Sequence, residues 1–191
     1  MDRRQLVMTV LTGAYVFGIS SKCFSQESLG RFVGEFDARF NAPPDNRNVT
    51  LLNELSFIDP DGLLWTAPKG IVVDGASIPW PLWSIVGSPY TGGYRRASVI
   101  HDRYCDTKER SWEDTHYVFY RASRVDGVTE WFAKLLYGGV LSFGPRWKRN
   151  RDSGEFEAIT PQLKEEDFNR LKDWILKDNP TIEEINRRII G

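Results

Sequence analysis

A single change of pattern at Asp74 constrains what this sequence can fold into. Between Arg31 and Asp74 the apolar residues alternate with polar ones, as in β-strands with one buried face. From Tyr94 onward they recur at intervals of three and four, which indicates amphipathic helices. The segment between, up to Gly93, is punctuated by glycine and proline and predicts a long loop. Strands followed by helices predict an α+β fold, with an N-terminal β hairpin region packed on a mainly helical remainder.

The β region is expected to contain a hairpin. Val49 to Ile58 and Leu63 to Val73 carry the β pattern, and Asp59-Pro60-Asp61-Gly62 between them has the residues of a tight turn. We therefore expect the two segments to pair as antiparallel strands.

The helical region is expected to begin with an antiparallel helix pair. The first helix covers Tyr94 to Asp106, and the second begins at Ser111, whose Ser111-Trp112-Glu113-Asp114 is a capping-box variant. Because the turn between them is short, we expect the two helices to pack antiparallel as a central pair. Three more helices are expected at Thr129 to Tyr137, where Gly138-Gly139 would end the helix, and at Lys164 to Lys177 and Thr181 to Ile190, which form a helical tail over residues 160–191.

The first 25 residues predict a signal peptide. The Arg3-Arg4 pair gives a positive start, Leu6 to Ile19 is an apolar stretch interrupted by glycines, and a small-residue cleavage site ends at Ser25. A spanning helix needs about 20 apolar residues, so a membrane anchor is only the alternative. The two arginines also resemble a twin-arginine signal. We expect an exported protein, periplasmic or secreted, with one globular domain over residues 26–191.

Charge and cysteine content exclude several classes of protein. With 41% hydrophobic and 27% charged residues the chain must fold around a core, which excludes wholesale disorder and fibrous repeats. A formal net charge of -1 argues against a dedicated nucleic-acid binder. Cleavage after Ser25 would leave Cys105 as the only cysteine, so no disulfide could form within the mature chain. No protein partner is indicated.

The residues with the clearest chemical potential lie in the helix pair. His101 falls on the apolar face of its helix, and Asp114 on the next helix shares a face with Tyr117 and Val118. Because a buried carboxylate needs a partner, we expect Asp114 to hold one nitrogen of His101 and leave the other as a general base. Tyr104, three residues after His101, completes the predicted catalytic set.

A cation site is expected beside this dyad. Asp102 follows His101 directly, and Asp74-Gly75 opens the glycine-rich loop, so that carboxylate and carbonyl oxygens would surround a hard cation such as Ca²⁺. Such an ion would polarise an ester carbonyl while His101 draws a proton from water. Zinc is disfavoured because thiolates are absent from this set and the histidines are few.

Each of these residues also has a plainer interpretation. His101 alone fits a hydrogen-bonded core residue, His116 is expected at the surface or its boundary, and Cys105 is expected as a buried apolar filler. The basic cluster Arg146 to Arg151 fits a solvated loop, with contact to anionic lipid or another polyanion as its alternative.

One set of motifs resembles a known family. The sequence carries Asp74-Gly75-Ala76-Ser77-Ile78-Pro79, then Trp83, Gly87, Ala97 to Asp102, Tyr104 and Asp114. This order resembles an uncharacterised bacterial and phage family known as domain of unknown function 1353. The resemblance covers the core motif region, residues 51–143, and implies no established activity.

A second resemblance carries a mechanism. The order of Asp74-Gly75, His101-Asp102, Tyr104 and Asp114 is similar to that in bacterial and fungal secreted phospholipases A2. The resemblance implies His101 as general base, Asp102 and loop carbonyls as Ca²⁺ ligands, and Asp114 as the orienting carboxylate. It predicts a calcium-dependent ester hydrolase acting on phospholipid at a membrane surface. The alternative is a non-catalytic envelope or phage-derived structural or binding module in which the same residues form a buried polar network.

Overall fold

The computed structural model describes residues 29–43, 48–74, 93–150, 152–159, 161–162 and 164–191. The predicted signal peptide and most of the predicted glycine-rich loop lie outside these ranges. In the part that is described, six short strands precede five helices, and a further strand pair lies between the third and the fourth helix. All the strands pair antiparallel, so the α+β fold class is confirmed.

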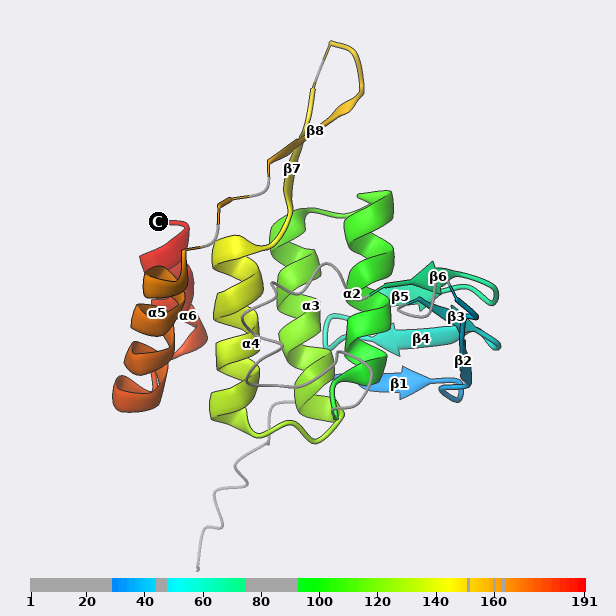
Figure 1. Cartoon of the computed structure of the whole chain (residues 1–191), viewed down its shortest axis with the longest axis horizontal. Coiled ribbons are helices and arrows are strands. Elements are labelled where there is room, and N and C mark those ends of the chain that lie inside the picture. The colour runs from blue at the N-terminus through cyan, green and yellow to red at the C-terminus, as the bar shows by residue number, and fades with distance from the viewer. Residues whose placement is uncertain (1–28, 44–47, 75–92, 151, 160, 163) are drawn as a thin grey trace, which may run out of the picture.

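The elements are arranged in layers (Figure 1). The N-terminal strands lie against α2 (Arg95–Thr107), and α3 (Trp112–Val125) packs beside α2. Next comes α4 (Glu130–Phe143), whose far side is covered by α5 (Glu165–Asp178) and α6 (Ile182–Ile189). The predicted helix pair therefore lies between the strands and the outer helices. None of the described helices has both the length and the apolar character to cross a membrane.

The predicted hairpin is present, but it is divided between two sheets. Its inner part pairs β4 with β5, and its outer part pairs β3 with β6, with Val49 opposite Val73. One sheet contains β1 (Arg31–Val33), β4 (Leu55–Ile58) and β5 (Leu64–Ala67), and the other contains β2 (Ala38–Phe40), β3 (Val49–Leu51) and β6 (Val72–Val73).

The turn between β4 and β5 is closed by a buried carboxylate. Asp59 accepts hydrogen bonds from the backbone N–H groups of Asp61, at 3.0 Å, and Leu63, at 2.9 Å. It also accepts one at 3.0 Å from the indole Nε1 of Trp65, a core residue. These three donors compensate for the desolvation of the carboxylate, so the tight turn predicted from Asp59 to Gly62 is confirmed.

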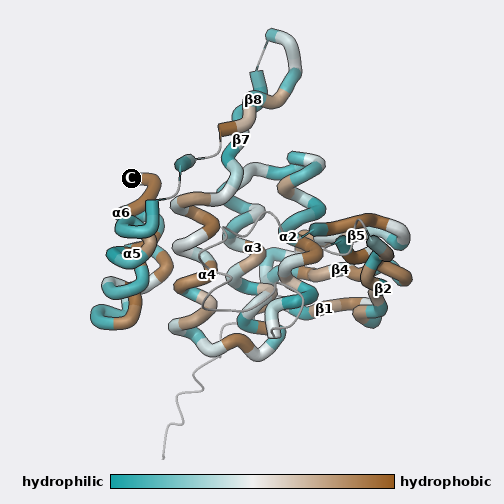
Figure 2. The backbone as a smooth tube through the Cα atoms, viewed as in Figure 1, coloured by the Kyte–Doolittle hydropathy of each residue, from teal (hydrophilic) through white to brown (hydrophobic). Residues whose placement is uncertain are grey.

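The core joins the layers. Large side chains that are fully buried come from both sheets and from the first helices, and they include Phe57, Trp65, Tyr94 and Phe119. In Figure 2 the apolar side of α5 faces α4, and its outer side is hydrophilic. Phe168, Leu171 and Ile175 are its buried residues. The outer helices therefore extend the same core rather than forming a separate one.

The predicted end of α4 is wrong, because the helix runs through Gly138-Gly139 to Phe143. A β-carbon on Gly138 would lie 3.2 Å from Cδ1 of Ile175 and 3.3 Å from Cδ1 of Leu171, both on α5. The glycine therefore permits close helix packing instead of ending the helix. The two tail helices are confirmed, and α6 has the expected capping box between Thr181 and Glu184.

Candidate functional site

The two histidines of the chain meet between α2 and α3. The side chains of His101 and His116 are both 0% exposed, and His101 Nε2 shares a 2.8 Å hydrogen bond with His116 Nδ1. Aromatic rings surround them: the His101 ring lies 4.8 Å from that of Phe119, and the His116 ring 5.7 Å from that of Trp112. The helix pair thus holds a polar contact within a largely apolar environment.

Cys105 completes this group. It lies one helical turn after His101 on α2, and its Sγ is 3.6 Å from His101 Nε2. The possible ligand atoms of His101, Cys105 and His116 all lie within 4.8 Å of one another. We call these three residues the His–Cys cluster. The predicted burial of Cys105 is confirmed at 5% exposure.

Burial makes both imidazoles weak bases. It lowers the pKa of His101 to about 3. Burial, followed by the neighbouring His101, holds the pKa of His116 well below its ordinary value. Both rings are therefore neutral at neutral pH.

The predicted pairing of His101 with Asp114 is wrong. Helix α3 begins at Trp112, so Asp114 lies in its first turn, where it is exposed. Its backbone N–H donates to Ser111 Oγ at 3.0 Å, and its carboxylate accepts from the same hydroxyl at 2.7 Å. Ser111 therefore caps the helix, and Asp114 is hydrogen-bonded to this cap instead of orienting His101.

The expectation that His116 lies near the surface is also wrong. The buried face of α3 includes His116, Phe119, Ala122 and Ser123, at spacings of three and four residues. The apolar Phe119 and Ala122 mark this face in the sequence, and His116 lies three residues before Phe119. If the buried face of the helix is assigned from Phe119 and Ala122, rather than from Tyr117 and Val118, His116 lies on that face.

The third residue of the predicted catalytic set, Tyr104, contacts the sheet. Tyr104 points to the sheet, where its hydroxyl accepts a 3.1 Å hydrogen bond from the Thr66 backbone N–H. Its ring packs edge-on against Trp65, with centroids 4.8 Å apart. Tyr104 thus ties α2 to β5.

The predicted calcium ligands are placed only in part. Asp102 is buried on α2, and Asp74 is exposed just after β6. Burial, and then the charge of Asp74, raises the pKa of Asp106, a residue near the end of α2. Gly75 lies outside the described residues, so the calcium site stays a prediction.

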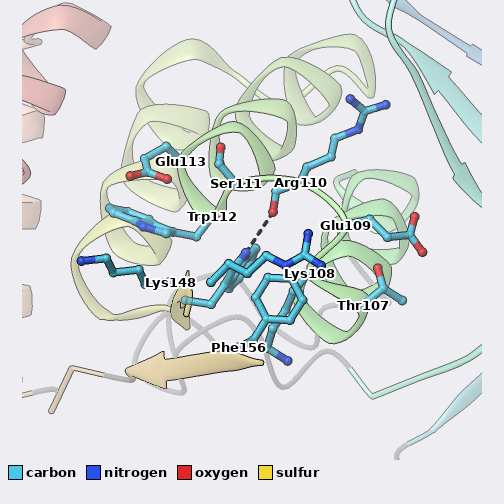
Figure 3. Close-up of a pocket in the computed structure, with 11 residues that line it drawn as sticks. Thr107, Lys108, Glu109, Arg110, Ser111, Trp112, Glu113, Lys148 and Phe156 are labelled. Carbon is cyan, nitrogen blue, oxygen red and sulfur yellow. Dashed lines mark hydrogen bonds between the residues drawn. The ribbon is translucent and has the colours of Figure 1, made fainter. Parts of the chain in front are cut away.

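An open pocket of about 720 Å³ lies where the α2–α3 turn meets a two-stranded hairpin (Figure 3). The hairpin consists of β7 (Arg146–Arg149) and β8 (Phe156–Ile159). The pocket is lined by the turn, the start of α3 and this hairpin: Thr107, Lys108, Glu109, Arg110, Ser111, Trp112, Glu113, Trp147, Lys148, Arg149 and Phe156. Basic and aromatic side chains predominate in this lining. We call it the hairpin pocket.

The β7–β8 hairpin projects beyond the ends of the helices (Figure 1). Trp147 anchors its base: the indole is 6% exposed, and its Nε1 donates to the Arg110 carbonyl oxygen at 2.9 Å, the dashed line in Figure 3. Beyond the anchor, Lys148 and Arg149 are exposed, as is Phe156 at 42%. Ile159, which lies opposite Arg146 at the base of the hairpin, is 57% exposed. The basic cluster predicted as a solvated loop is therefore partly a β-strand.

The molecule is thus an α+β protein with a His–Cys cluster inside a helix pair and a pocket under a projecting hairpin. Residues 49–140 match the model of the family described as "Protein of unknown function (DUF1353)", which supports the resemblance based on the sequence motifs. The matched segment contains the whole His–Cys cluster, whereas the β7–β8 hairpin lies beyond it.

Two curated proteins of Sinorhizobium fredii (strain NBRC 101917 / NGR234) are similar to this chain. "Uncharacterized protein y4jT" is 42% identical over 147 residues, covering 77% of this chain and 43% of the relative. "Uncharacterized protein y4iH" is 42% identical over 125 residues, covering 65% of this chain and 52% of the relative. The chain spans about half the length of these relatives. No solved structure gives a significant match. These matches lend no support to the resemblance to phospholipases A2.

Proposed function

We propose that this protein is a non-catalytic module that binds anionic phospholipid surfaces through the β7–β8 hairpin and the hairpin pocket. Of the two functions that the sequence suggests, hydrolase and binding module, the geometry favours the second. His101 is completely buried, and the exposed Asp114 is hydrogen-bonded to Ser111, the N-cap of α3. A general base must reach the proton that it removes, and this arrangement gives His101 no such access.

The observation that carries the proposal is the combination of exposed side chains on the hairpin. Phe156 and Ile159 are large apolar residues that a chain normally buries, yet on β8 they are 42% and 57% exposed. Lys148 and Arg149 are exposed on the neighbouring strand, with Arg149 directly opposite Phe156. Apolar side chains that enter the interface beside cations that contact lipid phosphates are typical of peripheral membrane binding.

The hairpin pocket has a charge that suits a lipid phosphate. Lys108, Lys148 and Arg149 line it, together with the carboxylates of Glu109 and Glu113. Glu109 is already paired with Arg103 at 2.8 Å, so it neutralises little of this charge. Each cation close to an anionic surface contributes about 1 kcal/mol of attraction.

Vesicle sedimentation tests the proposal with the full chain. We expect binding to vesicles that contain phosphatidylglycerol and much weaker binding to pure phosphatidylcholine. The double variant Phe156→Ser/Ile159→Ser should bind anionic vesicles at least about 10-fold more weakly, because each buried apolar side chain contributes about 2 kcal/mol. Equal binding to the two vesicle types, or unchanged binding by the double variant, would overturn the proposal.

Two controls separate this function from its competitors. Leu176→Ser removes an apolar side chain of similar exposure, 53%, from α5, far from the hairpin in the chain, and should leave vesicle binding unchanged. Fatty-acid release from the same vesicles in the presence of Ca²⁺ tests the hydrolase directly. If the parent releases fatty acid and a folded His101→Gln variant does not, the protein is a hydrolase and the binding-module proposal is wrong.

A further inference from the structure

We propose that His101, Cys105 and His116 bind one divalent transition-metal ion of the zinc class between α2 and α3. The inference is independent of the proposed membrane binding, since the His–Cys cluster lies inside the helix pair and the hairpin pocket lies outside it.

The chemistry of the ligands selects the ion. Imidazole nitrogen and thiolate sulfur are the donors that zinc prefers, whereas Ca²⁺ and Mg²⁺ require oxygen ligands. Two histidines and one cysteine make three protein ligands, which leaves the fourth position of a tetrahedral zinc ion for water. Among the described residues this is the one group of metal-binding side chains whose ligand atoms converge in this way.

One of the distances within the cluster matches that of a tetrahedral site, and another is shorter. Zn–N bonds of about 2.0–2.1 Å and a Zn–S bond of about 2.3 Å place ligand nitrogens about 3.3 Å apart and sulfur about 3.6 Å from nitrogen. Cys105 Sγ is 3.6 Å from His101 Nε2, and the two imidazole nitrogens are 2.8 Å apart. An entering ion would have to separate the rings by about half an ångström.

The placement of the three residues suits a link between two helices. His101 and Cys105 are four residues apart on α2 and therefore share one face, while His116 comes from α3. The buried His116 Nε2 makes no hydrogen bond of good geometry in the part of the chain that is described, although a backbone hydrogen bond with Pro145 acts to raise the pKa of this ring. A metal ion would replace the one hydrogen bond between the histidines by three bonds that connect the helices.

The test uses the full chain with Cys23→Ser, so that the one thiol left is Cys105. The protein is stripped with a chelator under reducing conditions, and Zn²⁺ alone is added back. We expect uptake of one equivalent and a rise in the thermal midpoint, because an ion that binds only the native state stabilises it. Co²⁺ in place of Zn²⁺ should give the d–d bands of a tetrahedral site and a thiolate charge-transfer band.

Two ligand variants and one matched control identify the site. Loss of even an outer-shell partner weakens metal binding by about 10–100-fold, so Cys105→Ser and His116→Gln should each weaken it at least that much. Cys105→Ser should also abolish the thiolate band of the Co²⁺ form. Ser123→Ala changes a buried polar residue on the same face of α3 and should bind metal like the parent.

The outcomes decide between a metal site and a packing contact. No stoichiometric uptake of Zn²⁺ by the folded parent would overturn the proposal, and so would a Cys105→Ser variant with unchanged affinity and an unchanged Co²⁺ spectrum. If His116→Gln does not fold, the Cys105→Ser result decides alone, since that substitution keeps the side-chain size nearly constant.

Discussion

His101 Nε2 lies 2.8 Å from His116 Nδ1, although the two residues are 15 positions apart and come from different helices. This contact replaces the histidine–aspartate dyad that the sequence suggested. The contact makes this part of the helix pair a buried link rather than a solvent-facing base.

The histidine contact predicts a strong coupling in stability. In the metal-free protein, His116→Leu leaves His101 without its nitrogen partner and should reduce the free energy of unfolding by about 1–3 kcal/mol. His101→Leu should act similarly. The double variant should lose less free energy of unfolding than the sum of the two single losses, because it removes both rings and so leaves neither of them buried without its partner.

Urea denaturation of the four proteins in this cycle measures the coupling. Strictly additive losses would show that the 2.8 Å contact contributes nothing to stability and that each ring acts only through its own packing.

The Asp59 carboxylate predicts a second stability effect at the β4–β5 turn. Asp59→Ala should reduce the free energy of unfolding by about 2–4 kcal/mol, because it leaves the buried Trp65 Nε1 and two turn N–H groups without their acceptor. Asp59→Asn retains one acceptor oxygen and should lose less. Thermal unfolding checks the order, and an alanine variant as stable as the parent would contradict this role.

Close packing of α4 on α5 predicts that Gly138 tolerates no large side chain. Gly138→Leu should reduce the free energy of unfolding by about 1–3 kcal/mol, since its β-carbon alone would already lie 3.2 Å from Ile175. Gly138→Ala should have a smaller effect, because better helix propensity, about 1 kcal/mol, offsets part of the crowding. Chemical denaturation of the two variants tests this order, and a fully stable leucine variant would show that the helices can separate freely.

The sequence was a good guide wherever a local pattern decides the structure. Alternation, turn residues and capping boxes predicted the β4–β5 hairpin, α2 and the two tail helices, because these depend on neighbouring residues. The phase of α3 was predicted wrongly, since Tyr117 and Val118 also suggest a buried face. Gly138 by itself predicts a helix end, because its packing partners on α5 lie more than 30 residues away and leave no local signal.

The candidate site was harder to predict than the fold. His101 was recognised as buried, but its partner depends on how α3 is rotated against α2, which no local pattern fixes. The hairpin pocket unites residues around 110 with residues around 150, and only tertiary structure brings them together.

Electrostatics predicts how the proposed membrane binding responds to salt. Lys148→Gln/Arg149→Gln should weaken binding to anionic vesicles about 10-fold or more, since each cation contributes about 1 kcal/mol. Raising the salt concentration toward 1 M, where the Debye length is about 3 Å, should weaken the parent similarly. Lys172→Gln/Lys177→Gln on α5 removes the same charge elsewhere and serves as the control. If both double variants lose the same binding to anionic vesicles, the protein is attracted to the vesicles by its net charge and not through the hairpin.

The most direct measurement places a fluorophore on the hairpin itself. In a Cys23→Ser chain, where Cys105 is buried, an environment-sensitive label is attached at Ile159→Cys or, as the control, at Leu176→Cys. The account predicts a blue shift on addition of phosphatidylglycerol vesicles for the label at position 159 and none for the label at position 176. An unchanged spectrum at position 159, or equal shifts at both positions, would contradict it.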